Sequence, residues 1–285
     1  MLNKRLFIFT LILTILVLML PEDSTARSRR TRASGEKYRS AVVMDADTGR
    51  ILFAENADRR VPPASVTKIL SLYLTYEAIS EGKVHLQDKV KVSKKAWRTQ
   101  GSRMFLEPNS EPTLDELITG ISVVSANDAS VALAEYIGGD LDKFVDRMNA
   151  KARQLGMLHS RFKNPHGLPA NGQMTTARDM AILAREYLRR FPQSLQIHSM
   201  QSYTYHNITQ YNHNLLLKRY PGTDGIKTGF VQASGYHLAA TAVQGNTRLI
   251  VVVLGSRTPG IRLRETIRLF DENFNKVQKE AAKKG

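Results

Sequence analysis

The sequence contains no cysteine, and this absence removes several classes of site at once. A disulfide framework, a thiolate zinc site, an iron–sulfur cluster and a cysteine nucleophile are all excluded. An oxidising compartment is not excluded, because a chain of 285 residues can build a core that needs no disulfides. The 18 glycines and 10 prolines are too few for a low-complexity polymer, and no segment repeats at a fixed period.

Acidic residues are scarce beside basic ones. The chain has 26 Asp and Glu against 41 Lys and Arg, for a formal net charge of +15. Such a charge favours anionic partners, among them nucleic acid, a membrane surface of anionic lipid, and acidic cell-wall polymer. The alternative is a solvated basic surface without a specific partner, because net charge governs solubility before it governs binding.

Two common hydrolase motifs are also missing. None of the seven histidines belongs to a His-Glu-x-x-His arrangement, and no Gly-x-Ser-x-Gly elbow occurs. His206 and His213 lie near one another in a stretch rich in Tyr and Asn, without further ligands around them. We interpret both as surface histidines, and we expect no metal site and no cofactor.

The N-terminus has the composition of an export signal. Lys4 and Arg5 precede the uncharged residues 6–20. As a helix this run would be about 22 Å long, shorter than the roughly 30 Å hydrocarbon core of a membrane. Residues 1–26 therefore fit a secretory signal peptide cleaved after Ala26, with an uncleaved anchor as the alternative. Export argues against nucleic acid as the partner of the positive charge.

Composition and periodicity divide the rest of the chain. Residues 27–37 are expected to form a basic flexible leader, residues 38–280 one folded domain, and residues 281–285 a tail. Residues 40–56 alternate apolar and polar side chains around a Gly-containing turn, which predicts a β-hairpin. Apolar steps of three and four predict an amphipathic helix over residues 65–79.

The middle of the chain, residues 113–190, is expected to be mostly helical, beginning with a capping box at Thr113 and Glu116. Two strands, Tyr236 to Val243 and Arg248 to Leu254, follow near the C-terminus, and a helix over residues 262–276 closes the chain. Strands at both ends and helices between them predict an α+β fold with one antiparallel sheet whose faces are covered by helices.

Three short motifs carry candidate chemistry. Ser-x-x-Lys occurs four times, but only Ser65–Lys68 follows Pro-Pro-Ala and opens a predicted helix. There the lysine amine, one turn along, can reach the serine hydroxyl, which needs an adjacent base to become nucleophilic. Taken alone, the pattern also fits a helix-capping serine with an unrelated surface lysine.

The other two motifs each occur once. Ser125-Ala126-Asn127 offers a hydroxyl and an amide that can relay a proton and orient a substrate amide, although Ser and Asn also cap helices. Lys227-Thr228-Gly229 runs into a strand, where it can bind a carboxylate and an oxyanion. The same three residues would also suit a turn beside an edge strand.

Together and in this order, the three motifs make the chain resemble the low-molecular-mass penicillin-binding proteins, the serine D-alanyl-D-alanine carboxypeptidases. The resemblance covers about residues 38–280 and includes PPASVTKIL, KAWRTQGSRMF, SANDASVALAEYI, NPHGL, GTDGIKTGF and VVVLGSRT. It implies a penicilloyl-serine-transferase fold (β-lactamase/transpeptidase-like), with a five-stranded antiparallel sheet, flanking helices and a helical subdomain. The site would lie between the sheet edge and that subdomain.

The resemblance also implies roles. Ser65 would be the acylated nucleophile, Lys68 its base and Ser125 a proton carrier. The substrate would be held by Asn127, Lys227, Thr228, Gly229, the backbone N–H of Phe230, and Arg262 in the loop after the last strand, with Arg257 as the competing arginine. The substrate would be a peptidoglycan stem pentapeptide that loses its terminal D-alanine, and β-lactam antibiotics would acylate the same serine. The enzyme would act outside the cytoplasm, in the periplasm or tethered by its N-terminal segment.

Departures from the family and rival functions stay open at this point. Ala126 stands where Gly is common, and the segment KVQKEAAKKG lacks an apolar face, so no C-terminal anchor is expected. A D,D-endopeptidase would need the same residues. A class A-like β-lactamase would need a loop carboxylate, yet Glu135 and Glu186 fall in predicted helices. A non-enzyme that binds wall polymer or senses penicillin is the third rival.

Overall fold

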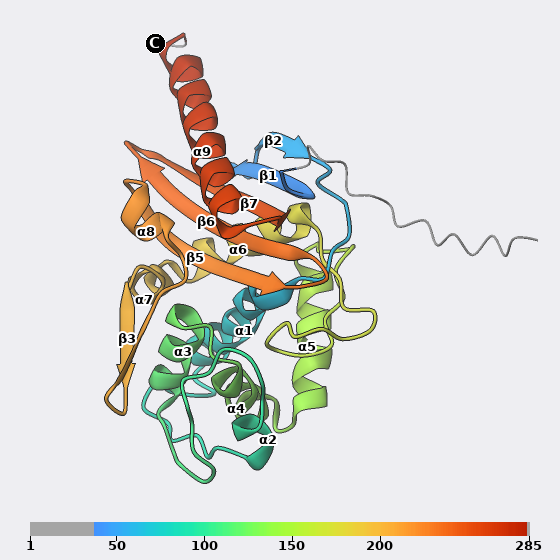
Figure 1. The fold of residues 1–285 in the computed structure, drawn as a ribbon, viewed down its shortest axis with the longest axis vertical. Coiled ribbons are helices and arrows are strands. Elements are labelled where there is room, and N and C mark those ends of the chain that lie inside the picture. Colours follow the sequence, from blue (N-terminus) through green and yellow to red (C-terminus); the bar gives the residue numbers. More distant parts are fainter. Residues whose placement is uncertain (1–36, 284–285) are drawn as a thin grey trace, which may run out of the picture. The chain divides into compact units, whose positions relative to one another are not determined.

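Strands from both ends of the described chain build one five-stranded antiparallel sheet in the computed structural model, which describes residues 37–283 (Figure 1). The strand order is β2-β1-β7-β6-β5, so β5 forms one edge. This confirms the predicted fold class. The strands are β1 (Ser40–Asp45), β2 (Ile51–Glu55), β5 (Thr223–Val231), β6 (Gly235–Gln244) and β7 (Thr247–Ser256).

The export signal predicted for residues 1–26 lies outside the described residues, as does the predicted leader apart from Lys37. Residues 37–283 belong to one compact unit. No helix among residues 37–283 combines the length and the apolar composition that crossing a membrane requires.

Both predicted hairpins are present, and local chemistry explains them. β1 pairs with β2 across a turn in which the Asp45 carboxylate accepts hydrogen bonds from the backbone and hydroxyl of Thr48, both at 2.8 Å. Such an Asx-type contact stabilises the turn without help from the rest of the fold. β6 pairs with β7 across Gly245, whose φ of +56° a glycine adopts freely.

Helices fill the segment between the two groups of strands. A 3₁₀ turn, η1, precedes α1, and a second, η2, precedes α7; β3 and β4 form a separate two-stranded ribbon. The bounds are η1 (Ala64–Thr67), α1 (Lys68–Ser80), α2 (Lys94–Trp97), α3 (Leu114–Val123), α4 (Asn127–Gly138), α5 (Leu141–Gln154), α6 (Ala177–Arg190), η2 (Pro192–Ser194), α7 (Leu195–His198), β3 (Ser202–Tyr205), β4 (Ile208–Tyr211), α8 (Leu216–Arg219) and α9 (Pro259–Ala282).

The central strands are buried on both faces. Along β7, Ile250, Val252 and Leu254 pack in the core shared with α1 and α6, whereas the alternate residues pack in a second core beneath α9. Alternation with period two therefore divides one strand between two hydrophobic cores. Figure 1 shows α9 crossing one face of the sheet and α6 lying behind the other.

Three features differ from the prediction. α1 is not amphipathic: its residues from Lys68 to Ala78 are all buried, because the helix runs between the sheet and the other helices. The C-terminal helix is longer than predicted, from Pro259 to Ala282. Proline suits the first helical position and the Thr258 hydroxyl caps the helix, so Arg262 lies in α9 and not in a loop. The β3–β4 ribbon was not predicted.

Candidate active site

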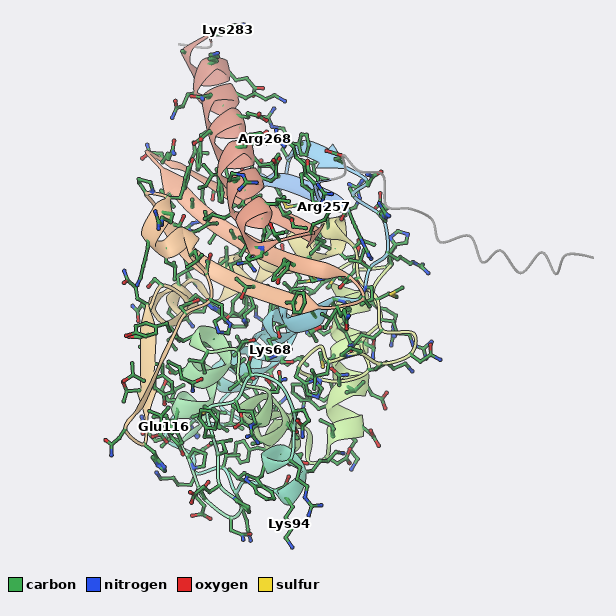
Figure 2. The ribbon with its side chains drawn as sticks, in the orientation of Figure 1. Lys68, Lys94, Glu116, Arg257, Arg268 and Lys283 are labelled. Atoms are coloured by element: carbon green, nitrogen blue, oxygen red, sulfur yellow. The ribbon has the colours of Figure 1, made fainter. Side chains whose placement is uncertain are left out.

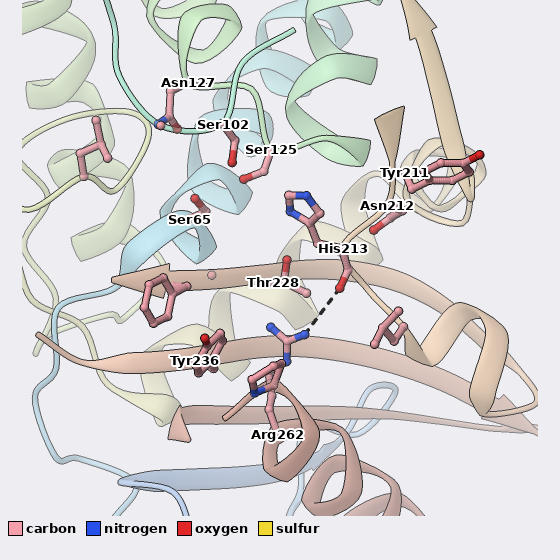
Figure 3. A pocket seen from close by; sticks show the side chains of 16 residues that line it. Ser65, Ser102, Ser125, Asn127, Tyr211, Asn212, His213, Thr228, Tyr236 and Arg262 are labelled. Atoms are coloured by element: carbon pink, nitrogen blue, oxygen red, sulfur yellow. Dashed lines mark hydrogen bonds between the residues drawn. The ribbon is translucent and has the colours of Figure 1, made fainter. Parts of the chain in front are cut away.

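A cleft of about 580 Å³ opens where the edge strand β5 faces the helical part of the chain (Figure 3). It brings together residues from η1, from the α3–α4 junction, from β5 and from α9. Its lining is Ser65, Gly101, Ser102, Ser125, Asn127, Leu168, Tyr211, Asn212, His213, Leu215, Thr228, Gly229, Phe230, Tyr236, Pro259 and Arg262.

Ser65 sits in the 3₁₀ turn at the entrance to α1, and its surroundings hold that turn in place. The preceding Ala64 has φ of +52°, a left-handed conformation that non-glycine residues rarely adopt. A buried chain of hydrogen bonds holds the backbone at Pro62, just before this turn. His237 accepts from Gly255 N–H and donates to the Ser234 hydroxyl, which donates to Pro62 O at 2.9 Å. The segment that leads into Ser65 is therefore tied to the ends of two strands.

Lys68 is fully buried one turn beyond the serine. Its Nζ lies 3.0 Å from Ser65 Oγ, 2.6 Å from Asn127 Oδ1 and 2.8 Å from His166 O. Burial, with the charge of Lys227 nearby, holds the pKa of Lys68 well below its ordinary value of 10.5. A lysine in this setting can be neutral near pH 7, as a general base must be.

Ser125 and Asn127 flank the junction of α3 and α4. Ser125 is buried with φ of +64°, and in Figure 3 its hydroxyl and that of Ser65 point into the same part of the cleft. The Asn127 amide bridges two segments, accepting from Lys68 Nζ and donating to Gln100 O at 2.6 Å. These two contacts fix which end of the amide is oxygen, because an –NH₂ group could not accept from Lys68.

Lys227, Thr228 and Gly229 lie on β5, the edge strand, and not in a turn. Lys227 is buried, and burial together with Arg262 lowers its pKa to about 7. A Cβ on Gly229 would lie only 3.0 Å from Ser65 N and 3.2 Å from Val66 N. Glycine therefore lets the strand approach Ser65 more closely than any other residue could.

Phe230 and Arg262 complete the predicted set. Phe230 is 52 % exposed at the mouth of the cleft, where its ring packs 4.4 Å from that of Tyr236. The Arg262 guanidinium reaches the cleft from α9 and donates to His237 O at 3.3 Å and His213 O at 3.5 Å. Arg257 is exposed and does not line the cleft.

Several residues that sequence reasoning did not single out also shape the site. The His166 carbonyl binds Lys68, and the buried Asp128 carboxylate accepts from the N–H groups of Met104 and Leu106. Both lie inside quoted motifs, NPHGL and SANDAS, which was the available signal. His213 is exposed, as predicted, yet its ring faces the cleft in Figure 3. Residues 37–283 contain no group of three or more His, Cys, Asp or Glu able to hold a metal ion.

Comparisons with known proteins agree with this geometry. The model of the peptidase S11 family, described as D-alanyl-D-alanine carboxypeptidase, matches residues 28–258. The chain belongs to this family. It is 39 % identical to D-alanyl-D-alanine carboxypeptidase DacF of Bacillus subtilis, over 96 % of this chain and 72 % of that one. It is also 39 % identical to DacC of Escherichia coli, over 87 % of this chain and 64 % of that one.

Solved structures of penicillin-binding proteins superimpose on the chain as well. Penicillin-binding protein 5 from Haemophilus influenzae matches with a TM-score of 0.82 and 39 % identity, over 84 % of this chain and 71 % of that one. Penicillin-binding protein D2 from Listeria monocytogenes, in an ampicillin-bound form, matches with a TM-score of 0.77 and 27 % identity, over 84 % and 97 %. The family and fold inferred from the three motifs are confirmed. The chain spans 60 to 72 % of the first curated relatives.

Proposed function

We propose that the chain is an exported serine D,D-carboxypeptidase that removes the terminal D-alanine from peptidoglycan stem pentapeptides. The observation that carries the proposal is the buried Lys68 amine, 3.0 Å from the Ser65 hydroxyl, inside a cleft lined by Ser125, Thr228 and Arg262. Family membership supports the reaction, and residues 4–26 support export. β-Lactams would acylate the same serine, as the ampicillin-bound relative suggests.

The hydrogen bonds of Lys68 favour its neutral form as the base. A neutral amine has two N–H bonds and one lone pair. Asn127 Oδ1 and His166 O accept the two N–H bonds, so the lone pair turns to the third neighbour, the Ser65 hydroxyl. Lys68 then takes the Ser65 proton as Oγ attacks the carbonyl carbon of the penultimate D-alanine.

The other residues bind the substrate and its charges. Thr228 and Arg262 line the cleft and would bind the terminal carboxylate, and the buried Lys227, on the same strand as Thr228, would add a positive charge. The backbone N–H groups of Ser65 and Phe230 would receive the oxyanion, which the close approach of β5 to η1 makes feasible. Asn127, which lines the cleft and contacts Lys68, would hold the substrate amide.

Two steps complete the cycle. In the first, the tetrahedral intermediate collapses, the amide C–N bond breaks, and D-alanine leaves with a proton delivered from Lys68 through the Ser125 hydroxyl. In the second, water attacks the ester on Ser65 and gives its proton to Lys68, and the breaking ester bond returns the proton to Ser65. The products are the tetrapeptide carboxylate and free enzyme.

The test uses two substrates and mass spectrometry. Purified protein without residues 1–26 is incubated with monomeric stem pentapeptide and, separately, with cross-linked muropeptide dimers. We expect loss of one D-alanine from the monomer and no activity from Ser65→Ala, which removes the nucleophile. Ser80→Ala is a matched control, because Ser80 belongs to another Ser-x-x-Lys in the chain. Cleavage of dimers alone would replace the proposal with an endopeptidase.

Penicillin should form a long-lived adduct. Fast deacylation in class A β-lactamases uses a loop glutamate. No glutamate is among the residues that line the cleft. Glu186 instead lies on α6, ion-paired with Arg185 and Arg189 at 3.0 and 2.8 Å. Intact-protein mass spectrometry should show stoichiometric penicilloyl-enzyme that persists after free penicillin is removed. Rapid turnover of a chromogenic cephalosporin would favour the β-lactamase alternative.

A further inference from the structure

A second concave site lies beside the cleft, on the segment we call the basic loop, residues 89–106. Between Asp88 and Glu107 this loop carries only positive charges. None of its cations takes part in an ion pair recorded for residues 37–283. Figure 2 shows Lys94 at the end of the molecule opposite α9. The cations are Lys89, Lys91, Lys94, Lys95, Arg98 and Arg103.

The loop borders an open surface cavity of about 340 Å³ lined by Trp97, Arg98, Gln100 and Arg103. Trp97 is 40 % exposed and Phe105 is 47 % exposed, with the Arg103 guanidinium 5.7 Å above the Phe105 ring. The Arg103 guanidinium also donates to Trp97 O at 3.4 Å. Exposed aromatic faces beside guanidinium donors suit a ligand that has an apolar face and oxygen acceptors.

Hydrogen bonds join this cavity rigidly to the catalytic cleft. Asn127 donates its side-chain amide to Gln100 O at 2.6 Å and its backbone N–H to Ser102 O at 2.7 Å. Gly101 and Ser102 line the cleft, whereas Gln100 lines the cavity. The two concavities therefore share one loop, which α4 holds in place. A ligand long enough could occupy both at once.

We propose that the cavity binds the saccharide end of a glycan-linked stem peptide while its D-alanyl end is in the cleft; this inference rests on the proposed function. Three residues separate the attacked fourth residue of a stem pentapeptide from the lactyl group of its amino sugar. Four residues of chain separate Gly101 from Trp97, so these two residues lie at most about 14 Å apart. Three extended stem residues together with the lactyl group can span a similar distance. The apolar face of the sugar would stack on Trp97, and Arg98 and Arg103 would donate hydrogen bonds to its hydroxyl and acetamido oxygens.

The kinetic test compares one pentapeptide in two forms, free and attached to its disaccharide. The wild type should prefer the attached form in kcat/KM by about tenfold, the scale of one charge-assisted contact. Trp97→Ala and Arg98→Gln/Arg103→Gln should abolish the preference and leave turnover of the free pentapeptide and acylation by penicillin unchanged. The control Arg219→Gln/Lys279→Gln removes two exposed charges elsewhere and should keep the preference.

A binding test separates this inference from the proposed function. Trp97 is the only tryptophan in the chain, so its fluorescence reports on the cavity alone. Titration with a disaccharide-tripeptide, which has no bond to cleave, should quench or shift this emission in wild type and not in Arg98→Gln/Arg103→Gln.

Three outcomes would overturn the inference. One is equal kcat/KM for the two substrate forms in the wild type. Another is an unchanged Trp97 emission at saturating disaccharide-tripeptide. The third is a shift caused by phosphatidylglycerol vesicles and not by the saccharide, which would make the basic loop a membrane-contact surface. If the protein showed the fluorescence response but no carboxypeptidase activity, saccharide binding at the cavity would stand and the proposed reaction would be rejected.

Discussion

At the scale of single residues, the site depends on lysines placed where water cannot stabilise their charge. Lys68 and Lys227 are both buried, and each has a cation close enough to lower its pKa, Lys227 for the first and Arg262 for the second. The two lysines have different neighbours. Lys68 contacts oxygen acceptors and the nucleophile, whereas Lys227 donates to the backbone oxygen of Thr228. The first is therefore suited to accepting a proton and the second to attracting an anion.

This difference predicts a pH profile with two limbs. Activity should fall in acid as Lys68 becomes protonated and can no longer act as a base. Because the pKa of Lys227 is about 7, kcat/KM should also fall above pH 7, as the free enzyme loses a charge that attracts the substrate carboxylate. The alkaline limb of kcat should lie at higher pH, since a bound carboxylate raises the pKa of Lys227.

Lys227→Arg tests the assignment of the alkaline limb. A guanidinium stays protonated over this range, so the variant should keep its kcat/KM above pH 7, where the wild type declines by up to about tenfold per pH unit. The acid limb should not move, because Lys68 is unchanged. Stopped assays of D-alanine release across pH 5 to 10 would measure both limbs. If the wild type and Lys227→Arg had the same alkaline limb, the limb would belong to a titrating group other than Lys227.

At the scale of elements, catalysis depends on how closely an edge strand packs against a 3₁₀ turn. β5 approaches η1 at Gly229, where a Cβ would press on the backbone of Ser65 and Val66. The partner atoms are backbone, so they cannot move aside as a flexible side chain would. Local patterns predicted the strand-forming segments and the Thr113 cap, which depend on neighbours in sequence. They did not predict the β3–β4 ribbon, whose strands are short and partly polar.

Gly229→Ala should therefore separate activity from folding. We expect acylation by a fluorescent penicillin to slow by about 10- to 100-fold, because a small displacement of the nucleophile or the oxyanion site has a large effect on rate. Gly260→Ala is the matched control, since the nearest atom to its Cβ would lie 3.6 Å away at the start of α9. Circular dichroism should show both variants folded. An unchanged acylation rate in Gly229→Ala would contradict the proposed role of the close approach.

At the scale of the whole molecule, one sheet separates two hydrophobic cores. Only one of them contains the helix that begins with Lys68. The core on the α1 and α6 side includes the helix that begins with Lys68, whereas the core beneath α9 includes Leu269, Phe270 and Phe274. Phe270 is fully buried in this second core, on the face of the sheet away from α1. A loss of packing beneath α9 should therefore lower stability without altering the chemistry.

Phe270→Ala tests this separation. The free energy of unfolding should fall by about 3–5 kcal/mol, through lost burial and the cavity left behind. Penicillin acylation at 25 °C should remain near the wild-type rate while the variant is folded. Leu158→Ala, at a side chain that is 72 % exposed, should change stability by less than about 0.5 kcal/mol. Urea denaturation would measure both, and a large loss of acylation in folded Phe270→Ala would show that the cores are coupled.

The sequence by itself determined the family, the two hairpins at the ends of the domain with helices between them, and the identity of the three motifs. Each of these depends on residue types and short spacings that any reader of the chain can see. Only the tertiary structure decided that Arg262, and not Arg257, faces the cleft, and that Lys68 has three oxygen partners from different segments. The reason is physical: burial and charge at one atom are sums over neighbours distant in sequence, and no local pattern contains that sum.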